Sequence, residues 1–452
     1  MTPRSGANTI RATARQEGFL ISGRFRFKAW ALVGAAMLCA AAAWTPSRVA
    51  AQRGGLFLGS ADDPGIQYST APLDNIVDDL NRTLEAGSAR LVFEGRSGYL
   101  RSAIDALKLP IDSQLLVYSK GSLQGRLVEP TNPRALFFSD RVALGWVRDA
   151  ELLEVAALDR RAGVVFYSLE QRPSERPAFK REFRCLGCHL TGDTLGIPGL
   201  LMFSSTPETS NGGGVKVVAT DHRTPYAERF GGWFVTGNRS LARHRGNQVA
   251  PLDDRSRGGL TSVAGLFDPD GFRGATSDIA ALLTFSHQAQ MTNLLTRASW
   301  EARAADPALH PGASIQLQAV DTLMNGVAEE VVDYMLFVDE PPLPNGVSGR
   351  SGFSERMSTS VPRDRNGRSL YELDLNRRLM KYPCSFLIYS PAFDALPPLV
   401  KTPIYRRMWQ VLSGDANGAR YRALTLEDRQ AIVEILRDTK SDLPAYFTTP
   451  RQ

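Results

Sequence analysis

The six residues from Arg184 to His189, which read Arg-Cys-Leu-Gly-Cys-His, constrain this chain more than any other stretch. Two cysteines separated by two residues and followed at once by histidine form the attachment signature of a c-type haem. The thiols of Cys185 and Cys188 can each form a thioether bond to one haem vinyl group, and His189 is then close enough to bind the iron. The motif therefore predicts one covalently bound haem c.

Two other kinds of site also use a Cys-x-x-Cys pair. A redox-active cysteine pair has no use for His189, and half of a zinc site needs further Cys or His ligands at metal-ligand spacing nearby. The chain has four cysteines, and Cys384 is the one left alone once the motif and the N-terminal segment are set aside. We expect its thiol to be buried as a small apolar group.

Residues 1–51 predict a secretory signal peptide of the Sec type. Basic residues over 24–28 precede an apolar run over 29–44, and small residues then offer a cleavage position before Gln52. The run is shorter than the roughly 20 residues that a membrane-spanning helix needs. Cys39 follows a leucine, where a lipoprotein signal would have a small residue. We therefore expect a periplasmic protein with no membrane span after signal cleavage.

The charge of the expected mature chain is balanced. The whole chain has 53 Lys and Arg against 47 Asp and Glu, and residues 1–51 hold seven of the former and one of the latter, which leaves 46 of each. A formally neutral protein has no excess positive charge to attract nucleic acid or an anionic membrane. We expect neither as a partner.

Residues 52–172 predict a mixed region that becomes rich in strands. Apolar periodicity indicates two short helices over 73–84 and 99–107. Five short β-branched or aromatic runs, separated by charged or Gly-containing turns, then predict an antiparallel sheet. These runs cover 115–118, 135–138, 142–147, 152–158 and 164–169. Since no cluster of ligand-type side chains stands out among them, we expect this region to form a wall of the haem site or to present a surface of the protein.

Residues 173–452 predict a mainly helical haem-binding region. The expected helices cover 278–304, with Ser277 as the cap, 317–338, 370–380, 402–412 and 425–436, and a long loop covers 343–366. Asn211-Gly-Gly-Gly214 predicts a turn. The predicted fold class is α+β, with a strand-rich N-terminal part followed by the helical part. It is not a standard small cytochrome c fold throughout, because no amphipathic helix opens the motif and no single Met stands out as a sixth ligand.

Two residues are candidates for contacts around the haem. In small cytochromes the carbonyl of a proline downstream of the motif accepts the Nδ1 proton of the proximal histidine, and Pro198 is placed for that role. A simple Pro-Gly turn explains Pro198 equally well. Trp233 lies in a Gly-flanked aromatic run and could pack on the macrocycle, or it could belong to a core strand.

The sixth iron ligand is the least constrained part of the site. His287 is the leading candidate because the apolar stripe of the helix over 278–304 turns it inward. His244 is the runner-up, although a position among arginines and near Gly246 is typical of a solvated loop. A methionine, either Met202 or Met291, could also bind the iron, or the sixth position could be open.

Beyond the haem motif, a wider set of short motifs carries a resemblance to a known family. The set is Asn132-Pro-Arg-Ala135, Gly145-Trp146, Val165-Phe-Tyr167, Cys185-Leu-Gly-Cys-His189, Phe230-Gly-Gly-Trp-Phe-Val-Thr-Gly237 and Tyr382-Pro-Cys-Ser385. The chain resembles c-type cytochromes and, more closely, exported bacterial monohaem proteins that are described only by their haem domain. The resemblance covers most of the mature chain and implies haem c with its iron as the cofactor.

Three classes of function are compatible with such a haem. The first is electron transfer with redox partner proteins in the periplasm. The second is a redox enzyme acting on a small molecule such as peroxide, which a mature chain of about 400 residues favours because a small electron carrier fits in roughly 100. The third is a haem-based sensor or binding protein. Electron transfer is the function that we expect.

Overall fold

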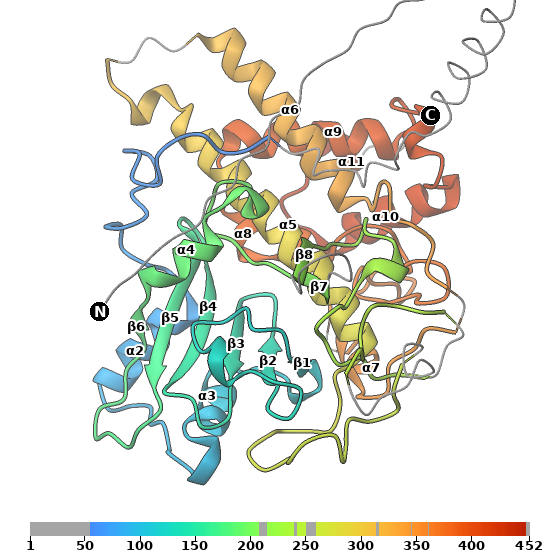
Figure 1. Ribbon diagram of the computed structural model, residues 1–452. Coiled ribbons are helices and arrows are strands. Elements are labelled where there is room, and N and C mark those ends of the chain that lie inside the picture. Colours follow the sequence, from blue (N-terminus) through green and yellow to red (C-terminus); the bar gives the residue numbers. More distant parts are fainter. Residues whose placement is uncertain are drawn as a thin grey trace, which may run out of the picture. The chain divides into compact units, whose positions relative to one another are not determined.

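The computed structural model describes residues 55–207, 215–238, 242–249, 259–312, 316–344, 346–359 and 361–448. The predicted signal peptide over 1–51 and the predicted turn at Asn211 to Gly214 lie outside these residues. An antiparallel sheet forms in the N-terminal half, and helices dominate the C-terminal half (Figure 1). The predicted α+β class is thereby confirmed.

The main sheet has six antiparallel strands in sequence order. They are β1 (Leu115–Val117), β2 (Arg134–Phe138), β3 (Val142–Trp146), β4 (Leu152–Asp159), β5 (Gly163–Glu170) and β6 (Lys180–Arg181). The five predicted strands are confirmed to within a residue at each end, because β-branched and aromatic runs bounded by turn residues are a strong local signal. The two-residue strand β6 was not expected.

Strand β4 shows how the sheet separates two environments. Its odd-numbered residues from Leu153 to Asp159 are buried, and the apolar ones pack in a core with helices α2 (Ile76–Glu85) and α3 (Leu100–Ala106). Its even-numbered residues, including Glu154 and Ala156, point to the other face and are half-buried. That second face is where the sheet is open to a ligand.

Helix α5 (Ile279–Ala304) is buried on nearly all sides and passes through the larger core. Its N-cap is Asp278, whose carboxylate accepts the Ala280 N–H at 2.8 Å. The prediction of Ser277 as the cap is therefore wrong by one residue. The Ser277 hydroxyl instead accepts the N–H of Leu116 at 2.9 Å, which ties the start of the helix to the sheet.

Three further long helices complete the C-terminal half: α6 (Leu317–Met335), α9 (Pro398–Leu412) and α10 (Leu426–Thr439). Their apolar sides pack with α5 in one core. Thr425 and Asp428 form a capping box at the start of α10, each accepting the other's backbone N–H.

The helix predicted over 370–380 does not form. Leu375 takes a left-handed conformation with φ 59°, and the Asp374 carboxylate accepts the Asn376 N–H at 3.2 Å. Such a local side-chain hydrogen bond competes with the helical pattern. The stretch closes on itself through an isolated bridge between Leu373 and Met380.

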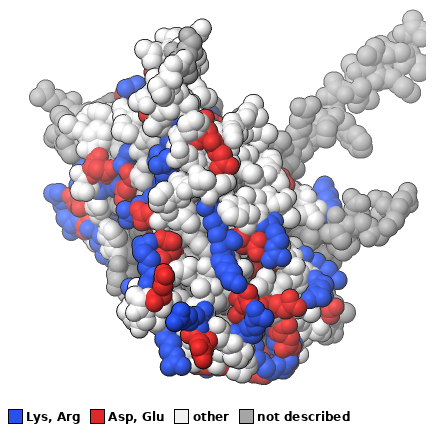
Figure 2. Space-filling model, turned by 90° about the vertical axis from the view of Figure 1, so that its left-hand side faces the viewer, with Lys and Arg blue, Asp and Glu red and all other residues white. Residues whose placement is uncertain are grey.

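Shorter elements connect these parts. They are α4 (Leu186–His189), α7 (Phe353–Met357), α8 (Pro391–Asp394), α11 (Ala445–Thr448) and the hairpin of β7 (Phe203–Pro207) and β8 (Val215–Ala219). None of the helices within the described ranges combines the length and the apolar character that crossing a membrane requires. On the face shown in Figure 2, basic and acidic side chains are interleaved rather than gathered by sign.

Candidate functional site

A cavity of about 320 Å³ lies against the half-buried face of the main sheet. It is lined by residues of β2 to β5, residues 120–123, four residues of the motif over 184–189, Leu200, Leu201, Phe203 and Phe285 of α5, and we call it the CxxCH cavity. Small-molecule and cofactor sites commonly occupy roughly 300–1,000 Å³. The cavity is therefore large enough to be a binding site.

The sheet supplies a floor of small side chains. Strand register places Gly145 opposite Glu154, and Ala143 opposite Ala156, which is in turn opposite Phe166 on β5. Because these residues alternate with inward-pointing neighbours, all five project from the same face of the sheet. The Ala143 and Ala156 positions leave a shallow trough beside Phe166, whereas the space over Gly145 is occupied by the Arg134 guanidinium.

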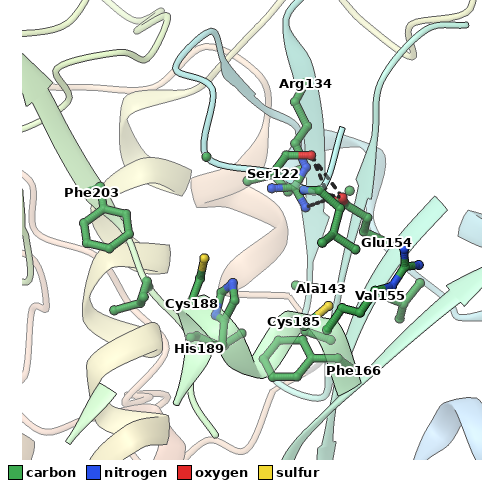
Figure 3. A pocket seen from close by; sticks show the side chains of 18 of the residues that line it. Ser122, Arg134, Ala143, Glu154, Val155, Phe166, Cys185, Cys188, His189 and Phe203 are labelled. Carbon is green, nitrogen blue, oxygen red and sulfur yellow. Dashed lines mark hydrogen bonds and ion pairs between the residues drawn. The ribbon is translucent and has the colours of Figure 1, made fainter. Parts of the chain in front are cut away.

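The pairing of β6 with β5 places the haem motif next to this trough. Arg181 pairs with Tyr167, next to Phe166, so the chain enters the motif beside the sheet face. The Cys185 side chain is half-buried and that of Cys188 is exposed, and both thiols are free and line the cavity (Figure 3). Burial, helped by the nearby Glu154 carboxylate, raises the pKa of the Cys185 thiol to about 12. This thiol is therefore protonated at neutral pH.

His189 is oriented by its backbone surroundings. Its Nδ1 lies 2.8 Å from the carbonyl oxygen of Gly199, and its ring lies 4.8 Å from the ring of Phe166. Burial lowers the pKa of the imidazole, so the ring is neutral at neutral pH. A neutral ring that donates Nδ1–H to a carbonyl leaves the Nε2 lone pair free, and this is the form in which histidine binds a metal.

The expected role of Pro198 needs correction. The carbonyl that contacts His189 Nδ1 belongs to Gly199, the next residue along the chain. A backbone carbonyl does fix the tautomer and the direction of the His189 ring, as we predicted. The turn, however, presents the carbonyl of Gly199 rather than that of Pro198. The Gly199 N–H also donates to the His189 carbonyl at 2.9 Å, so this turn is fastened to the motif from both sides.

An ion pair lines the cavity on the side away from His189, with its carboxylate near enough to the Cys185 thiol to affect that thiol's pKa. Arg134 Nη2 is 2.5 Å from Glu154 Oε2, and the two side chains are 17% and 11% exposed. The Glu154 carboxylate also accepts the Ser122 hydroxyl at 3.0 Å and the Leu123 N–H at 3.1 Å. In Figure 3, Arg134, Ser122 and Glu154 cluster on the side of the cavity away from His189. Arg134 Nε is buried without a hydrogen-bond partner.

The residues of the cavity fit a covalently attached haem. Two free thiols at the required spacing and a neutral imidazole with a free Nε2 meet at one side of it. The remaining walls are mostly apolar, and basic side chains stand at the edge, where the carboxylates of a haem could be held. The apolar side chains of the walls are Leu123, Leu136, Ala143, Ala156, Phe166, Leu200, Leu201, Phe203 and Phe285.

The structure does not bring His287 to this cavity. Its side chain is fully buried, with Nδ1 2.7 Å from His222 Nδ1 and Nε2 2.7 Å from the Ser385 hydroxyl. Both ring nitrogens already have partners, so neither is left to bind iron. The helix does turn His287 inward as predicted, but into the core among Tyr334 and Phe337, and we withdraw it as a sixth-ligand candidate.

The remaining sixth-ligand candidates also lie outside the CxxCH cavity. His244 is buried rather than solvated: its ring packs against Tyr226 and Phe230, and its Nδ1 accepts the Gly246 N–H at 3.0 Å. The solvated-loop prediction for His244 was wrong because that packing covers the ring. Met202 and Met291 are buried in the larger core.

Trp233 is a core residue, and its ring does not line the cavity. Its indole N–H donates to the Phe203 carbonyl at 2.7 Å, and Phe203 itself is a wall residue. A core position therefore describes Trp233 better than haem packing does. Cys384 is fully buried, and burial raises the pKa of its thiol, as expected for a small apolar residue.

The buried pair of His222 and His287 should make the protein sensitive to acid. Burial lowers the pKa of His287 from 6.5 to about 3, and it lowers that of His222 well below 6.5. Below pH 6.5 the unfolded chain binds protons at these sites and the folded chain does not, so stability falls as the pH drops towards 3. We expect a loss of up to about 1.4 kcal/mol per pH unit for each histidine, measured by urea unfolding at about pH 7 and about pH 5.

The variant His287→Gln isolates this contribution. Glu340 acts with the opposite sign, because burial raises its pKa from 4.5 to about 7, so the absolute pH dependence mixes several groups. Glutamine retains a donor and an acceptor but cannot titrate, and the variant should lose less stability between the two pH values than the parent protein. Equal losses in both proteins would contradict the interpretation.

Sequence reasoning missed Arg134, Glu154, Ser122 and the Gly199 carbonyl. A signal was available, since the motifs that carried the family resemblance include Arg134, Gly145 and Phe166. All three of these residues line the CxxCH cavity. What the motifs could not indicate is that these residues come together, because they lie on three different strands.

No protein-family model, curated protein or solved structure matches this chain. Within the described residues no three His, Cys, Asp or Glu side chains gather into a metal site. A haem iron, however, needs only one ligand from its attachment motif. The case for a cofactor thus rests on the residues of the cavity themselves.

Proposed function

We propose that this chain is an exported monohaem c-type cytochrome that exchanges electrons with redox partner proteins in the periplasm. The observation that carries the proposal is the convergence of the Cys185 and Cys188 thiols and the His189 imidazole on one apolar cavity. Haem c, when bound there, supplies a one-electron couple at its iron. Export follows from the predicted signal peptide over 1–51.

The residues of the chain would perform three tasks. His189, held by the Gly199 carbonyl, presents Nε2 to the iron in a fixed direction. The apolar walls keep water from the centre of the site, which tunes the potential. Cys188 is exposed and so sets one edge of the site at the protein surface, where a partner protein can approach.

A second candidate function is a haem redox enzyme that acts on a small molecule such as peroxide. The specific observation in its favour is the lining of the cavity: among the described residues there, His189 is the sole histidine and no methionine is present. An open sixth position would admit a small ligand next to Arg134. A sensor or binding role would use the same opening.

Optical and magnetic-resonance spectra of the holoprotein in both oxidation states test the proposal. We expect a reversible one-electron titration of a covalent haem. If electron transfer is the main role, the iron should be low-spin, and carbon monoxide should not displace its axial ligand. A ferrous form that binds carbon monoxide would instead favour the enzyme or the sensor, and a protein that shows no haem spectrum would contradict all three.

A further inference from the structure

Arg134 is a charged residue of the CxxCH cavity to which the proposed electron transfer gives no task. Its Nη2 is engaged by Glu154, but its Nε–H is buried and has no partner. Several other described arginines also have a buried Nε without a partner, but of these Arg134 alone lines the cavity. A charged donor is therefore available inside a binding site.

The guanidinium is held in place before any ligand arrives. Glu154, which fixes it, is itself fixed by the Ser122 hydroxyl and the Leu123 N–H. Gly145 leaves the room for it: a Cβ at that position would lie 2.6 Å from Arg134 Nε and closer still to Nη2. Because its position is fixed by the protein, this donor loses little freedom when it binds an acceptor.

A planar guanidinium with a free N–H is suited to one oxygen of a carboxylate or of a similar small oxyanion. We propose that Arg134 is the anion-binding residue of this cavity, donating a charge-assisted hydrogen bond from Nε to such a group. Lys120, an exposed cation that also lines the cavity, adds attraction for an anion. This proposal rests on the proposed function, since the cavity is taken to hold haem.

The anion can come from two sources. A haem carries its two propionates at the ring edge opposite the vinyl groups, and in Figure 3 Arg134 lies at the top of the view, with the Cys185 and Cys188 thiols below it. A haem joined to the thiols would thus direct carboxylates away from the motif, towards the side of Arg134. In the second case, a free anion such as formate enters the cavity and lies between Arg134 and an open sixth position.

The experiment uses holoprotein with Arg134→Gln, which removes the charge and both Nη groups and leaves a neutral amide near the position of Nε. Arg126→Gln is the matched control, because Arg126 is exposed, pairs with Glu151 at 3.5 Å and does not line the cavity. Gly145→Ala is a second variant that displaces the guanidinium without removing it. Each protein is measured for haem mass, reduction potential and the response of the ferric spectrum to formate.

The two sources give different results, and both support the proposal. A free anion predicts a saturable formate response that weakens at least tenfold in Arg134→Gln and not in Arg126→Gln. A propionate predicts no formate response in any protein, but a reduction potential that falls in Arg134→Gln, because a positive charge beside the haem is lost. Gly145→Ala should change the same quantity in the same direction.

The proposal is overturned if Arg134→Gln keeps both the potential and the formate response of the parent protein. Failure of the proposed function looks different. In that case the mass measurement finds no covalent haem in any of the proteins, the parent included.

Discussion

Purified holoprotein should carry the added mass of one haem, and the double substitution Cys185→Ala, Cys188→Ala should abolish it. Both thiols line the CxxCH cavity and are free to form thioether bonds. Without them nothing links the haem covalently to the chain, so the effect is all or none. Intact-mass measurement under denaturing conditions, after expression with the haem-attachment machinery, gives the result directly.

Cys384→Ala is the control for this experiment. Its thiol is fully buried in the larger core and lies outside the cavity, so the added mass should be unchanged. An unmodified polypeptide from the parent chain would refute the haem interpretation, the proposed function and the role assigned to His189 together.

Replacement of His189 by alanine should change the haem spectrum and potential more than any other single histidine substitution. His189 is the histidine of the cavity, and its free Nε2 is the atom that would bind iron. The axial ligand is a dominant control on the potential, which spans roughly 0.8 V across haem proteins. Visible spectra and a redox titration of covalently loaded His189→Ala measure the effect.

His287→Ala should behave in the opposite way. Its ring is bonded to His222 and Ser385 in the core, so we expect an unchanged haem spectrum and a loss of stability. Each of those groups left buried without a partner costs about 1–3 kcal/mol, which urea unfolding would detect. His310→Ala is the matched control, because His310 pairs with Asp63 away from both sites. A spectrum altered by His287→Ala would restore that residue as a ligand candidate.

Local patterns were enough to predict the elements that form this site. The strands β2 to β5 were predicted because each is a short β-branched or aromatic run between turns, and helix α5 was predicted because its apolar stripe is a local signal. The haem motif is likewise local, since its three functional residues lie within five positions. Short-range chemistry specifies such features almost independently of the rest of the chain.

The helix predicted over 370–380 shows where local patterns fail. Its apolar spacing suits a helix, but the Asp374 side chain bonds a neighbouring backbone N–H and Leu375 adopts a left-handed conformation. Leu375 and Leu379 are also buried in the larger core, so the conformation of this stretch has to fit contacts with residues distant in the chain. Such contacts cannot be predicted from the residues of 370–380 alone.

His287 and Arg134 show which features of the site could be predicted from local patterns and which depend on the tertiary structure. Local residue patterns were sufficient to predict the attachment motif and the strands, and helical periodicity was sufficient to predict that His287 points inward. These patterns did not determine what lies there: His287 meets His222 and Ser385, 65 and 98 residues away in the chain. Arg134 meets Glu154 because two hairpins place their strands in register. Contacts between distant segments depend on the assembled core, so only the tertiary structure could place these residues.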